Sequence, residues 1–299
     1  MTYNNTIKKV LCIIVTYNAS DWLNTCISSV VNSDYPVDLA VVDNASTDGT
    51  ADLIKNQYLD SISYFYPLNE NLGFGKAHNF VFHECDLTEY DYVFLLNQDA
   101  EISRSGISEL VQVAEGDGTL GILSPIHYYS EGVMDRSFAG YYDRTLGERT
   151  KINGINVRMV DFVNAAIWLV RADLIIKLDG FNPLFQHYGE DTNFVHKLHA
   201  AGYRVGIVES TAGFHYRNQE ATGLDRRSFA DMFYLKRLIR LLNPSLYFLK
   251  EIIVLLGAAA NHIFLYLINN ELGEAKNILN GLVKLLKQLA VIYHYRKLT

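Results

Sequence analysis

The first 125 residues alternate short apolar runs with longer segments whose apolar residues recur at helical spacing. Short apolar runs bounded by turn residues are typical of buried strands, and the periodic segments are typical of amphipathic helices. The predicted strands are Val10–Thr16, Leu39–Asp43, Ile62–Tyr66, Tyr92–Leu96 and Leu120–Ser124. The predicted helices are Trp22–Val31, Thr50–Tyr58, Gly75–Glu84 and Ser105–Ala114. This alternation predicts an α/β fold with a mainly parallel sheet covered by helices on both faces.

The rest of the chain shows two other patterns. Residues 126–224 lose the regular alternation and predict a mixed α/β region with a longer strand at Val160–Val170. From about Ser228 the pattern becomes helical, with large apolar faces. We therefore predict an α/β domain over residues 1–224 and a C-terminal amphipathic helical region over residues 225–299.

Polar residues follow three of the predicted strands at the point where each strand ends. They are Thr16-Tyr17-Asn18, the segment 43–49 and Asn97-Gln98-Asp99. Ligands of such sheets bind beyond the carboxyl ends of the strands, so we expect a ligand site at this edge. A turn at Asp48-Gly49 with a helix cap at Ser46 or Thr47 would explain one of these loops, but not all three.

The distribution of charge narrows the choice of partners. The chain has 26 Lys and Arg against 33 Asp and Glu. Residues 225–299 hold 11 against 5, a net charge of +6, which leaves 15 against 28, a net charge of −13, for residues 1–224. The negative charge of residues 1–224 makes nucleic acid a poor partner, whereas the positive charge of residues 225–299 suits an anionic surface.

The cysteines and the N-terminal segment indicate a compartment. The three cysteines have no CxxC spacing, and Cys12 sits in an apolar run, where a buried thiol is expected. The run that follows Lys8 and Lys9 has only six apolar residues, too few for the core of a signal peptide. We expect a protein of the reducing cytoplasm.

Five short motifs, in this order along the chain, resemble those of the family 2 glycosyltransferases of the GT-A fold. The likeness is greatest to bacterial rhamnosyltransferases and their galactofuranosyltransferase relatives, and it covers roughly residues 10–220. The motifs are Val15–Asn18, Val42–Gly49, Asn69–Gly75, Asn97–Asp99 and Gly189–Asp191. The resemblance implies an inverting, metal-dependent enzyme that transfers a sugar from a nucleotide-sugar donor during cell-surface polysaccharide synthesis.

The resemblance also implies which residues bind the donor. Asp43 would accept the N3–H of a pyrimidine base, although capping of the helix that begins near Thr47 would also explain it. The glycine-bearing loop 71–75 leads into a helix whose N-terminus attracts phosphate. The residues that we expect at the donor are Thr16, Tyr17, Asn18, Asp43, Asn71, Gly73, Asn97 and Asp99.

Asn97-Gln98-Asp99 occupies the place of the family's Asp-x-Asp metal motif. A divalent cation, Mn²⁺ or Mg²⁺, held there would neutralise the departing diphosphate. The chain departs from the motif at Asn97, which removes one charge and leaves Asp99 as the direct ligand, with Asn97 at the ribose or at a metal-bound water. His215 would be the second ligand, although a lone histidine is more often an ordinary structural residue.

Gly189-Glu190-Asp191 precedes a segment with helical periodicity. Inverting transfer needs a base that deprotonates the acceptor hydroxyl as it attacks. By resemblance Asp191 is that base, and Glu190 orients the acceptor or the loop. The other interpretation is that both carboxylates only stabilise a helix N-terminus.

Several alternatives stay open at this level. The donor implied by the resemblance is dTDP-rhamnose, with UDP-linked galactofuranose, N-acetylglucosamine or glucose as the alternative. The acceptor would be a saccharide or a polyprenyl-diphosphate-linked saccharide. The C-terminal helices would pack on the body, form a homodimer or make a peripheral contact with the inner face of the cell membrane. A non-catalytic nucleotide-sugar-binding protein is also possible because of Asn97, whereas a nucleotidyltransferase would need a Gly-rich basic loop after the first strand.

Overall fold

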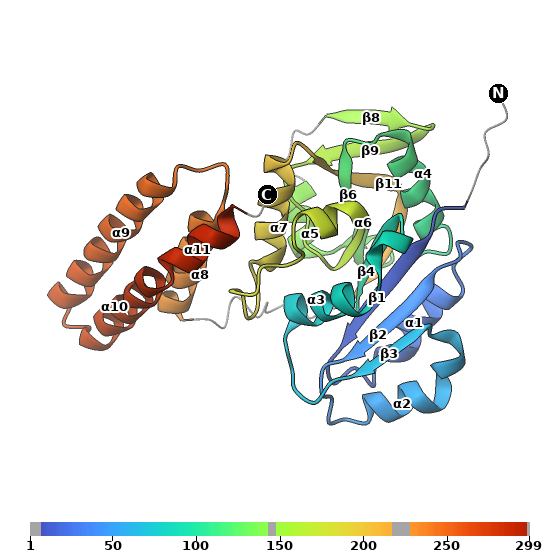
Figure 1. The fold of residues 1–299 in the computed structure, drawn as a ribbon, viewed down its shortest axis with the longest axis horizontal. Helices are drawn as coiled ribbons and strands as arrows, with labels where there is room; N and C mark the ends of the chain where they lie inside the picture. The colour runs from blue at the N-terminus through green and yellow to red at the C-terminus, as the bar shows by residue number, and fades with distance from the viewer. Residues whose placement is uncertain (1–6, 143–147, 217–227, 298–299) are drawn as a thin grey trace.

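The computed structural model describes residues 7–142, 148–216 and 228–297. It contains an α/β domain built on a central sheet and, beside it, a bundle of C-terminal helices (Figure 1). The predicted fold class is therefore confirmed. The predicted boundary between residues 224 and 225 lies outside the described residues, so the division into two units stays a prediction.

The sheet places the strands in the order β3-β2-β1-β4-β10-β6-β11-β9-β8, with β5 paired to β11 and β7 paired to β6. Its strands are β1 (Val10–Thr16), β2 (Asp38–Asp43), β3 (Tyr64–Pro67), β4 (Tyr92–Asn97), β5 (Ala100–Ile102), β6 (Leu120–Ser130), β7 (Val133–Met134), β8 (Arg149–Ile152), β9 (Ile155–Val160), β10 (Ile167–Arg171) and β11 (Arg204–His215).

The helices of the α/β domain are α1 (Leu23–Val31), α2 (Thr50–Gln57), α3 (Phe74–Glu84), α4 (Gly106–Gly116), α5 (Arg136–Tyr142), α6 (Ala172–Lys177) and α7 (Glu190–Ala200), with short 3₁₀ turns at Leu59–Ser61 and Leu87–Glu89. The predicted helices of the first 125 residues all form, with ends that differ from the prediction by one or two residues. The third strand lies slightly later in the chain than predicted, because it begins at Tyr64 and not at Ile62.

The prediction of a mainly parallel sheet is correct for the five strands predicted in the first 125 residues, which all run in one direction, whereas the whole sheet, which includes the short antiparallel β5, is mixed. Strands β2, β1 and β4 are parallel neighbours, and β3 is parallel to β2. β10 is inserted antiparallel between β4 and β6, so β4 and β6 still run in one direction. β9 then extends the sheet antiparallel to β11, and β8 pairs antiparallel with β9.

The predicted long strand Val160–Val170 is wrong. β9 ends at Val160 and pairs with β11, whereas β10 begins at Ile167 and pairs with β4 and β6. Because these two positions in the sheet are not adjacent, the chain must leave the sheet between them. Residues 161–166 make this crossing and reach the carboxyl end of β4, where Ile167 lies opposite Leu96.

Alternating side chains of the buried strands pack into two separate cores, one on each face of the sheet. In β1, Leu11 and Ile13 belong to the core under α3, α6 and α7, whereas Cys12 and Ile14 face α1, α2 and α4. This alternation follows from the two-residue period of a strand. The sheet is therefore held rigidly from both sides, which fixes the positions of the loops at its carboxyl edge.

The C-terminal helices have a core of their own. They are α8 (Phe229–Leu242), α9 (Phe248–Ile268), α10 (Leu272–Lys287) and α11 (Leu289–Arg296). Figure 1 shows α9 on the side of this bundle that lies away from the sheet. Phe185, from the loop before α7, is buried in the bundle core beside Phe233 and Leu235. The bundle is thus joined to the α/β domain by apolar packing next to α7.

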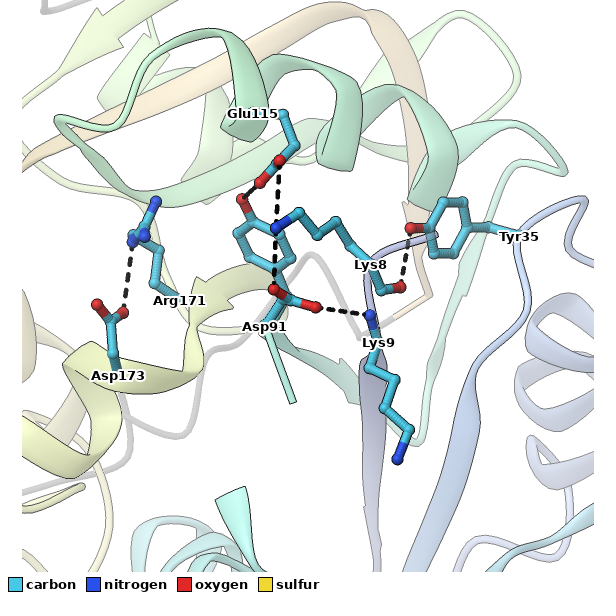
Figure 2. Close-up of polar contacts among 8 residues, drawn as sticks. Lys8, Lys9, Tyr35, Asp91, Glu115, Arg171 and Asp173 are labelled. Carbon is cyan, nitrogen blue, oxygen red and sulfur yellow. Dashed lines mark hydrogen bonds and ion pairs between the residues drawn. The ribbon is translucent and has the colours of Figure 1, made fainter. Parts of the chain in front are cut away.

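The amino edge of the sheet carries a network of ion pairs (Figure 2). Lys8 Nζ lies 3.1 Å from Asp91 Oδ1 and 3.5 Å from Glu115 Oε2, and the backbone N–H of Lys9 donates to Asp91 Oδ2 at 2.9 Å. Tyr92 donates its hydroxyl hydrogen to Glu115 at 2.6 Å. These contacts tie the starts of β1 and β4 together, and the network is structural.

Candidate active site

The loops after β1 and β2 are held together by the side chain of Asp43, which is 2% exposed. Its Oδ1 accepts hydrogen bonds from the Thr16 hydroxyl at 2.9 Å and the Ser46 hydroxyl at 2.5 Å, and its Oδ2 accepts the Ser46 N–H at 3.0 Å. Asp43 therefore sits at the strand end where a ligand base is expected, but it also organises its own loop.

The structure places the side chain of Thr16, one of the residues expected at the donor, behind Asp43. Thr16 is fully buried, and its hydroxyl donates to Asp43 and to the carbonyl oxygen of Val42. It lies at the end of β1, in register with Asp43, so its side chain supports that carboxylate from within the protein. Tyr17, the next residue, is exposed at the edge.

Asn18 connects the same two loops through its backbone and its amide. It has a positive φ of 50°, and its Oδ1 accepts the N–H of Thr47 at 2.8 Å while its N–H donates to the Ser46 hydroxyl at 2.9 Å. Gln98 does the same for the loop after β4: its Oε1 accepts the N–H of Tyr17 at 2.6 Å, and its Nε2 donates to the Tyr17 carbonyl at 3.2 Å. Three loops that are distant in sequence thus form one rigid edge.

The glycine-bearing loop before α3 is fixed by two asparagines. Asn71 Oδ1 accepts the N–H of Gly73 at 2.8 Å. The buried Asn44 accepts the N–H of Leu72 at 3.0 Å and donates to the Gly73 carbonyl at 3.3 Å. Gly73 has a φ of +76°, and a Cβ added there would lie 2.7 Å from the carbonyl oxygen of Gln186. Only glycine therefore allows this loop to touch the segment that leads into α7.

A second glycine brings α3 next to α7 itself. A Cβ added at Gly75 would lie 3.1 Å from Cβ of Phe181 and 3.5 Å from Cβ of Glu190. Glu190 is 6% exposed, so its side chain is enclosed between the two helices. The loop expected to bind the donor and the loop expected to supply the base therefore meet in the folded chain.

Asp99 and His215 are brought together by the pairing of β5 with β11, in which His215 lies opposite Ala100. Asp99 Oδ1 is 3.4 Å from Nε2 of His215, and Asn97 Nδ2 is 3.5 Å from the same nitrogen. Two donor atoms at this separation can contact one cation. Within the described ranges, no group of three or more His, Cys, Asp or Glu residues is arranged to hold a metal ion.

Asp99 and His215 together fit a divalent cation whose other coordination positions are filled by ligands from outside the protein. Mn²⁺ and Mg²⁺ accept carboxylate oxygens, and Mg²⁺ commonly keeps waters and phosphate oxygens as its other ligands. Asp99 is partly exposed, whereas His215 is buried, so the pair is accessible from the side of the carboxylate. The neutral Asn97 adds an amide next to the pair and no charge.

The opposite side of the His215 ring faces a buried carboxylate that the sequence did not suggest. Oδ2 of Asp135 lies 3.9 Å from Nδ1 of His215, and Asp135 is completely buried. Asp135 Oδ1 accepts the N–H of Phe138 in α5 at 2.9 Å, which fixes the carboxylate. The pattern around residue 135 has no strand or helix period, so sequence reasoning had no basis for selecting it.

Asp191 occupies the first turn of α7 and is half-buried. Its Oδ1 accepts the N–H of Thr192 at 2.6 Å. Burial raises the pKa of the Asp191 carboxyl above its ordinary value, while hydrogen bonds from Thr192 and from the backbone of Ala165 lower it. The burial effect is the larger one, which makes this carboxylate more basic than an exposed aspartate.

The crossing segment 161–166 lies between Asp191 and the residues of the expected metal motif. The backbone of Ala165 lies beside the Asp191 carboxylate, and the carbonyl oxygen of the next residue, Ala166, accepts the N–H of Asn97 at 2.9 Å. The two groups therefore lie next to adjacent residues of one segment. A substrate bound over this segment would have Asp191 on one side and Asn97 and Asp99 on the other.

Helix α7 is anchored at its far end by a buried lysine. The ammonium of Lys197 donates to the carbonyl oxygens of Leu178 and Gly180, the latter at 3.4 Å. Burial lowers the pKa of Lys197 to about 8, against a smaller effect of Asp179 that raises it. This contact ties α7 to the turn after α6 and keeps its N-terminus at the site.

Comparison with known proteins identifies the family of the chain. Residues 11–179, more than half of the chain, match Glycosyl transferase family 2. The chain is 25% identical over 243 residues to the N-acetylglucosaminyl-diphospho-decaprenol L-rhamnosyltransferase of Mycobacterium tuberculosis, covering 72% of this chain and 78% of that protein. It is 27% identical over 133 residues to the GalNAc(5)-diNAcBac-PP-undecaprenol beta-1,3-glucosyltransferase of Campylobacter jejuni, covering 44% of this chain and 42% of that protein.

Solved structures share the fold at low sequence identity. The structure of S. aureus TarS 1-349 in complex with UDP-GlcNAc superposes with a TM-score of 0.62 at 17% identity, covering 97% of this chain and 90% of that one. The mannosyltransferase PcManGT of Pyrobaculum calidifontis, in complex with GDP-Man and Mn²⁺, gives a TM-score of 0.56 at 16% identity over 94% and 88% of the two chains. The chain spans 41% of the longer TarS chain.

The matched residues contain the strand ends of β1, β2 and β4, and they stop before α7 and the end of β11. The family is thus established by the half of the chain that carries the expected donor loops. The chain belongs to glycosyl transferase family 2 and has the GT-A fold of a glycosyltransferase.

Proposed function

We propose that this glycosyltransferase is an inverting enzyme that uses a divalent metal ion and a nucleotide-sugar donor. The observation that carries the proposal is that the crossing segment 161–166 reaches both groups: the backbone of Ala165 lies beside the Asp191 carboxylate, and the carbonyl oxygen of Ala166 accepts the N–H of Asn97 at 2.9 Å. This arrangement supports a base and a leaving-group site on opposite sides of one bound sugar.

The proposed step uses Asp191 as the general base. The carboxylate takes the proton of the acceptor hydroxyl, and the acceptor oxygen forms a bond to the anomeric carbon. The bond from that carbon to the diphosphate oxygen breaks with inversion, and the nucleoside diphosphate leaves with the electron pair. The raised pKa of Asp191 supports this role, because a base that is closer to neutrality binds the transferred proton more strongly.

Asp99 and His215 would hold the metal ion, which would supply positive charge for the departing diphosphate. Asn97 would hold the same region through its amide, at the ribose or at a water on the metal. Asp43 and the exposed ring of Tyr17 would contact the nucleoside, and Asn18 would keep their loop in place. Asn71 and Gly73 would shape the loop that borders the donor.

The donor and the acceptor are proposed from the relatives. The Mycobacterium relative is a rhamnosyltransferase, and both relatives are named for acceptors that carry a diphospho-polyprenol. We therefore propose dTDP-rhamnose as the donor, with UDP-linked sugars as the alternative because the TarS complex contains UDP-GlcNAc. The acceptor would be a lipid-linked saccharide at the cytoplasmic face of the membrane.

A panel of nucleotide sugars tests the proposal. Thermal unfolding would be measured with dTDP-rhamnose, UDP-galactofuranose, UDP-N-acetylglucosamine and UDP-glucose, each with Mn²⁺, with Mg²⁺ and with a chelator. One donor should raise the melting temperature in the presence of metal, because a ligand that binds the folded state stabilises it. Slow hydrolysis of the same donor would show catalysis, whereas stabilisation without hydrolysis or transfer would favour a nucleotide-sugar-binding protein.

A further inference from the structure

The outer face of α9 is largely apolar, with the exposed Lys250 and Asn261 among its residues. From Ile252 to Asn270 the chain contains no Asp, Glu, Lys or Arg. Along one side of the helix, Leu249 is 75% exposed, Ile253 70%, Phe264 61% and Ile268 62%. These residues recur at near-helical spacing and lie on one face. At 1.5 Å per residue, the 21 residues of α9 make an apolar stripe about 30 Å long.

The opposite face of α9 is committed to the bundle. Leu255 and Ala259 are fully buried in its core. Glu251, at the start of α9, is 3% exposed and forms two hydrogen bonds with Arg240 of α8, at 2.6 and 2.8 Å. The helix is long and apolar enough to cross a membrane by length and composition. Crossing would, however, break these contacts and expose a buried carboxylate, which favours a helix that stays in the bundle.

Helix α10 packs along α9 and continues the apolar surface. Leu272, Leu279, Val283 and Leu286 are exposed on α10. Lysines border them: Lys276 precedes Leu279 by three residues, and Lys287 follows Val283 by four, so both are surface neighbours of the apolar residues. Lys284 is also exposed on this helix, with its ammonium 4.3 Å from the centroid of the Tyr234 ring of α8. We call the exposed apolar residues of α9 and α10, with Lys276, Lys284 and Lys287, the bundle surface.

We propose that the bundle surface binds a bilayer that contains anionic phospholipid, with α9 lying in the plane of the interface. Apolar side chains would enter the boundary of the acyl chains while the lysines contact the headgroups. Residues 228–297 carry nine Lys and Arg against four Asp and Glu, which complements an anionic surface. A symmetric second copy would instead bring the same positively charged surface against itself.

The test is flotation of the full chain with vesicles made of equal parts phosphatidylcholine and phosphatidylglycerol, without donor or acceptor. The wild-type chain should float with these vesicles, and raising the salt concentration should reduce the floating fraction. The double variant Ile253→Glu, Phe264→Glu should lower the partition coefficient at least about tenfold, because it places charge on the apolar face. Its control is Ile176→Glu, at an apolar residue of α6 that is 50% exposed, and this variant should float like the wild type.

The lysines are tested separately. Replacing Lys276, Lys284 and Lys287 by Glu should lower partitioning roughly 100-fold, a factor of about five for each lysine near an anionic surface. Lys151→Glu, on β8 of the α/β domain, is the matched control and should have no effect. Pure phosphatidylcholine vesicles should bind the triple-lysine variant and the wild type equally.

Three outcomes would overturn the proposal. A wild-type chain that ignores these vesicles but sediments as a dimer, which Phe264→Glu dissociates, would show that the bundle surface joins two copies. Resistance of the membrane-bound chain to extraction at alkaline pH would show that α9 crosses the bilayer. Unchanged flotation of both sets of variants would show that the bundle surface is not the part of the chain that binds the bilayer. Because the assay needs no sugar chemistry, its failure would leave the proposed enzymatic function untouched.

Discussion

Oδ2 of the completely buried Asp135 lies 3.9 Å from Nδ1 of His215, on the opposite side of the imidazole ring from Asp99. At 3.9 Å the contact is longer than a hydrogen bond, so the carboxylate acts on the ring through its charge, which favours hydrogen on Nδ1 and leaves Nε2 able to bind a metal ion. Asp135 is therefore a positioning residue for His215, held in turn by the N–H of Phe138.

Asp135→Asn should weaken metal binding by less than the roughly tenfold that follows the loss of a hydrogen-bonded outer partner, because only the charge next to the His215 ring is removed. The variant keeps an oxygen that can accept the Phe138 N–H, so folding should survive. Titration of Mn²⁺ by electron paramagnetic resonance measures the affinity directly. Metal affinity equal to that of the wild type would show that Asp135 serves α5 alone.

Asp99→Ala and His215→Asn should each remove most metal-dependent donor binding, because each removes one of the two proposed protein ligands. Asn97→Asp should preserve or strengthen metal affinity, since it restores a carboxylate next to the pair. Calorimetric titration of donor with and without Mn²⁺ distinguishes these effects. Full transferase activity in excess EDTA would contradict the metal proposal as a whole.

Asp191→Asn should lower the rate of transfer by roughly 10²–10⁴-fold while donor binding survives, because only the proton acceptor is lost. Single-turnover assays with the donor identified by the thermal panel would measure the chemical step. Glu190→Gln is the matched control on the neighbouring residue. If Glu190→Gln is inactive and Asp191→Asn turns over normally, the two roles are reversed.

The raised pKa of Asp191 predicts a specific pH dependence. The base works when deprotonated, so log kcat/KM should rise with pH through a pKa above the ordinary value of about 3.9. Because the pKa of the folded state exceeds that of the unfolded state, the carboxyl favours folding most when it is protonated. That contribution is lost as the pH rises from the unfolded to the folded pKa. Asp191→Asn should therefore abolish this pH dependence of the melting temperature and leave stability near neutral pH equal or higher.

Gly73→Ala should destabilise the fold by about 1–3 kcal/mol, because the backbone at φ 76° and ψ 179° is almost restricted to glycine. It should also weaken donor binding, since a Cβ would push the loop away from Gln186. Gly132→Ala is the control: Gly132 also has a positive φ, of 71°, but a Cβ there meets nothing within 4 Å. Equal losses of donor affinity in the two variants would show that the contact with Gln186 is unimportant.

The local pattern of the sequence was sufficient for the elements of the first 125 residues. The continuous apolar run Leu11–Ile14 predicts a buried strand, and the structure distributes these side chains between two cores. The polar strand ends at Asp43 and Asn97 predicted the edge of the sheet that carries the candidate site. Such predictions succeed because a strand or helix exposes its period within a few neighbouring residues.

Only the tertiary structure decided which of these residues meet and which are enclosed. The apolar pattern at Val160–Val170 did not reveal that the chain crosses there from β9, beside β11, to β10, beside β4. Strand pairing is a contact between distant segments, so the local pattern does not show it. The burial of Thr16, the position of Asp135 behind His215 and the exposed outer face of α9 are likewise set by packing between elements. The sequence by itself determined the elements, the family resemblance and the chemistry available at the strand ends. The fold determined how that chemistry is arranged, because distances between side chains over 100 residues apart depend on long-range packing.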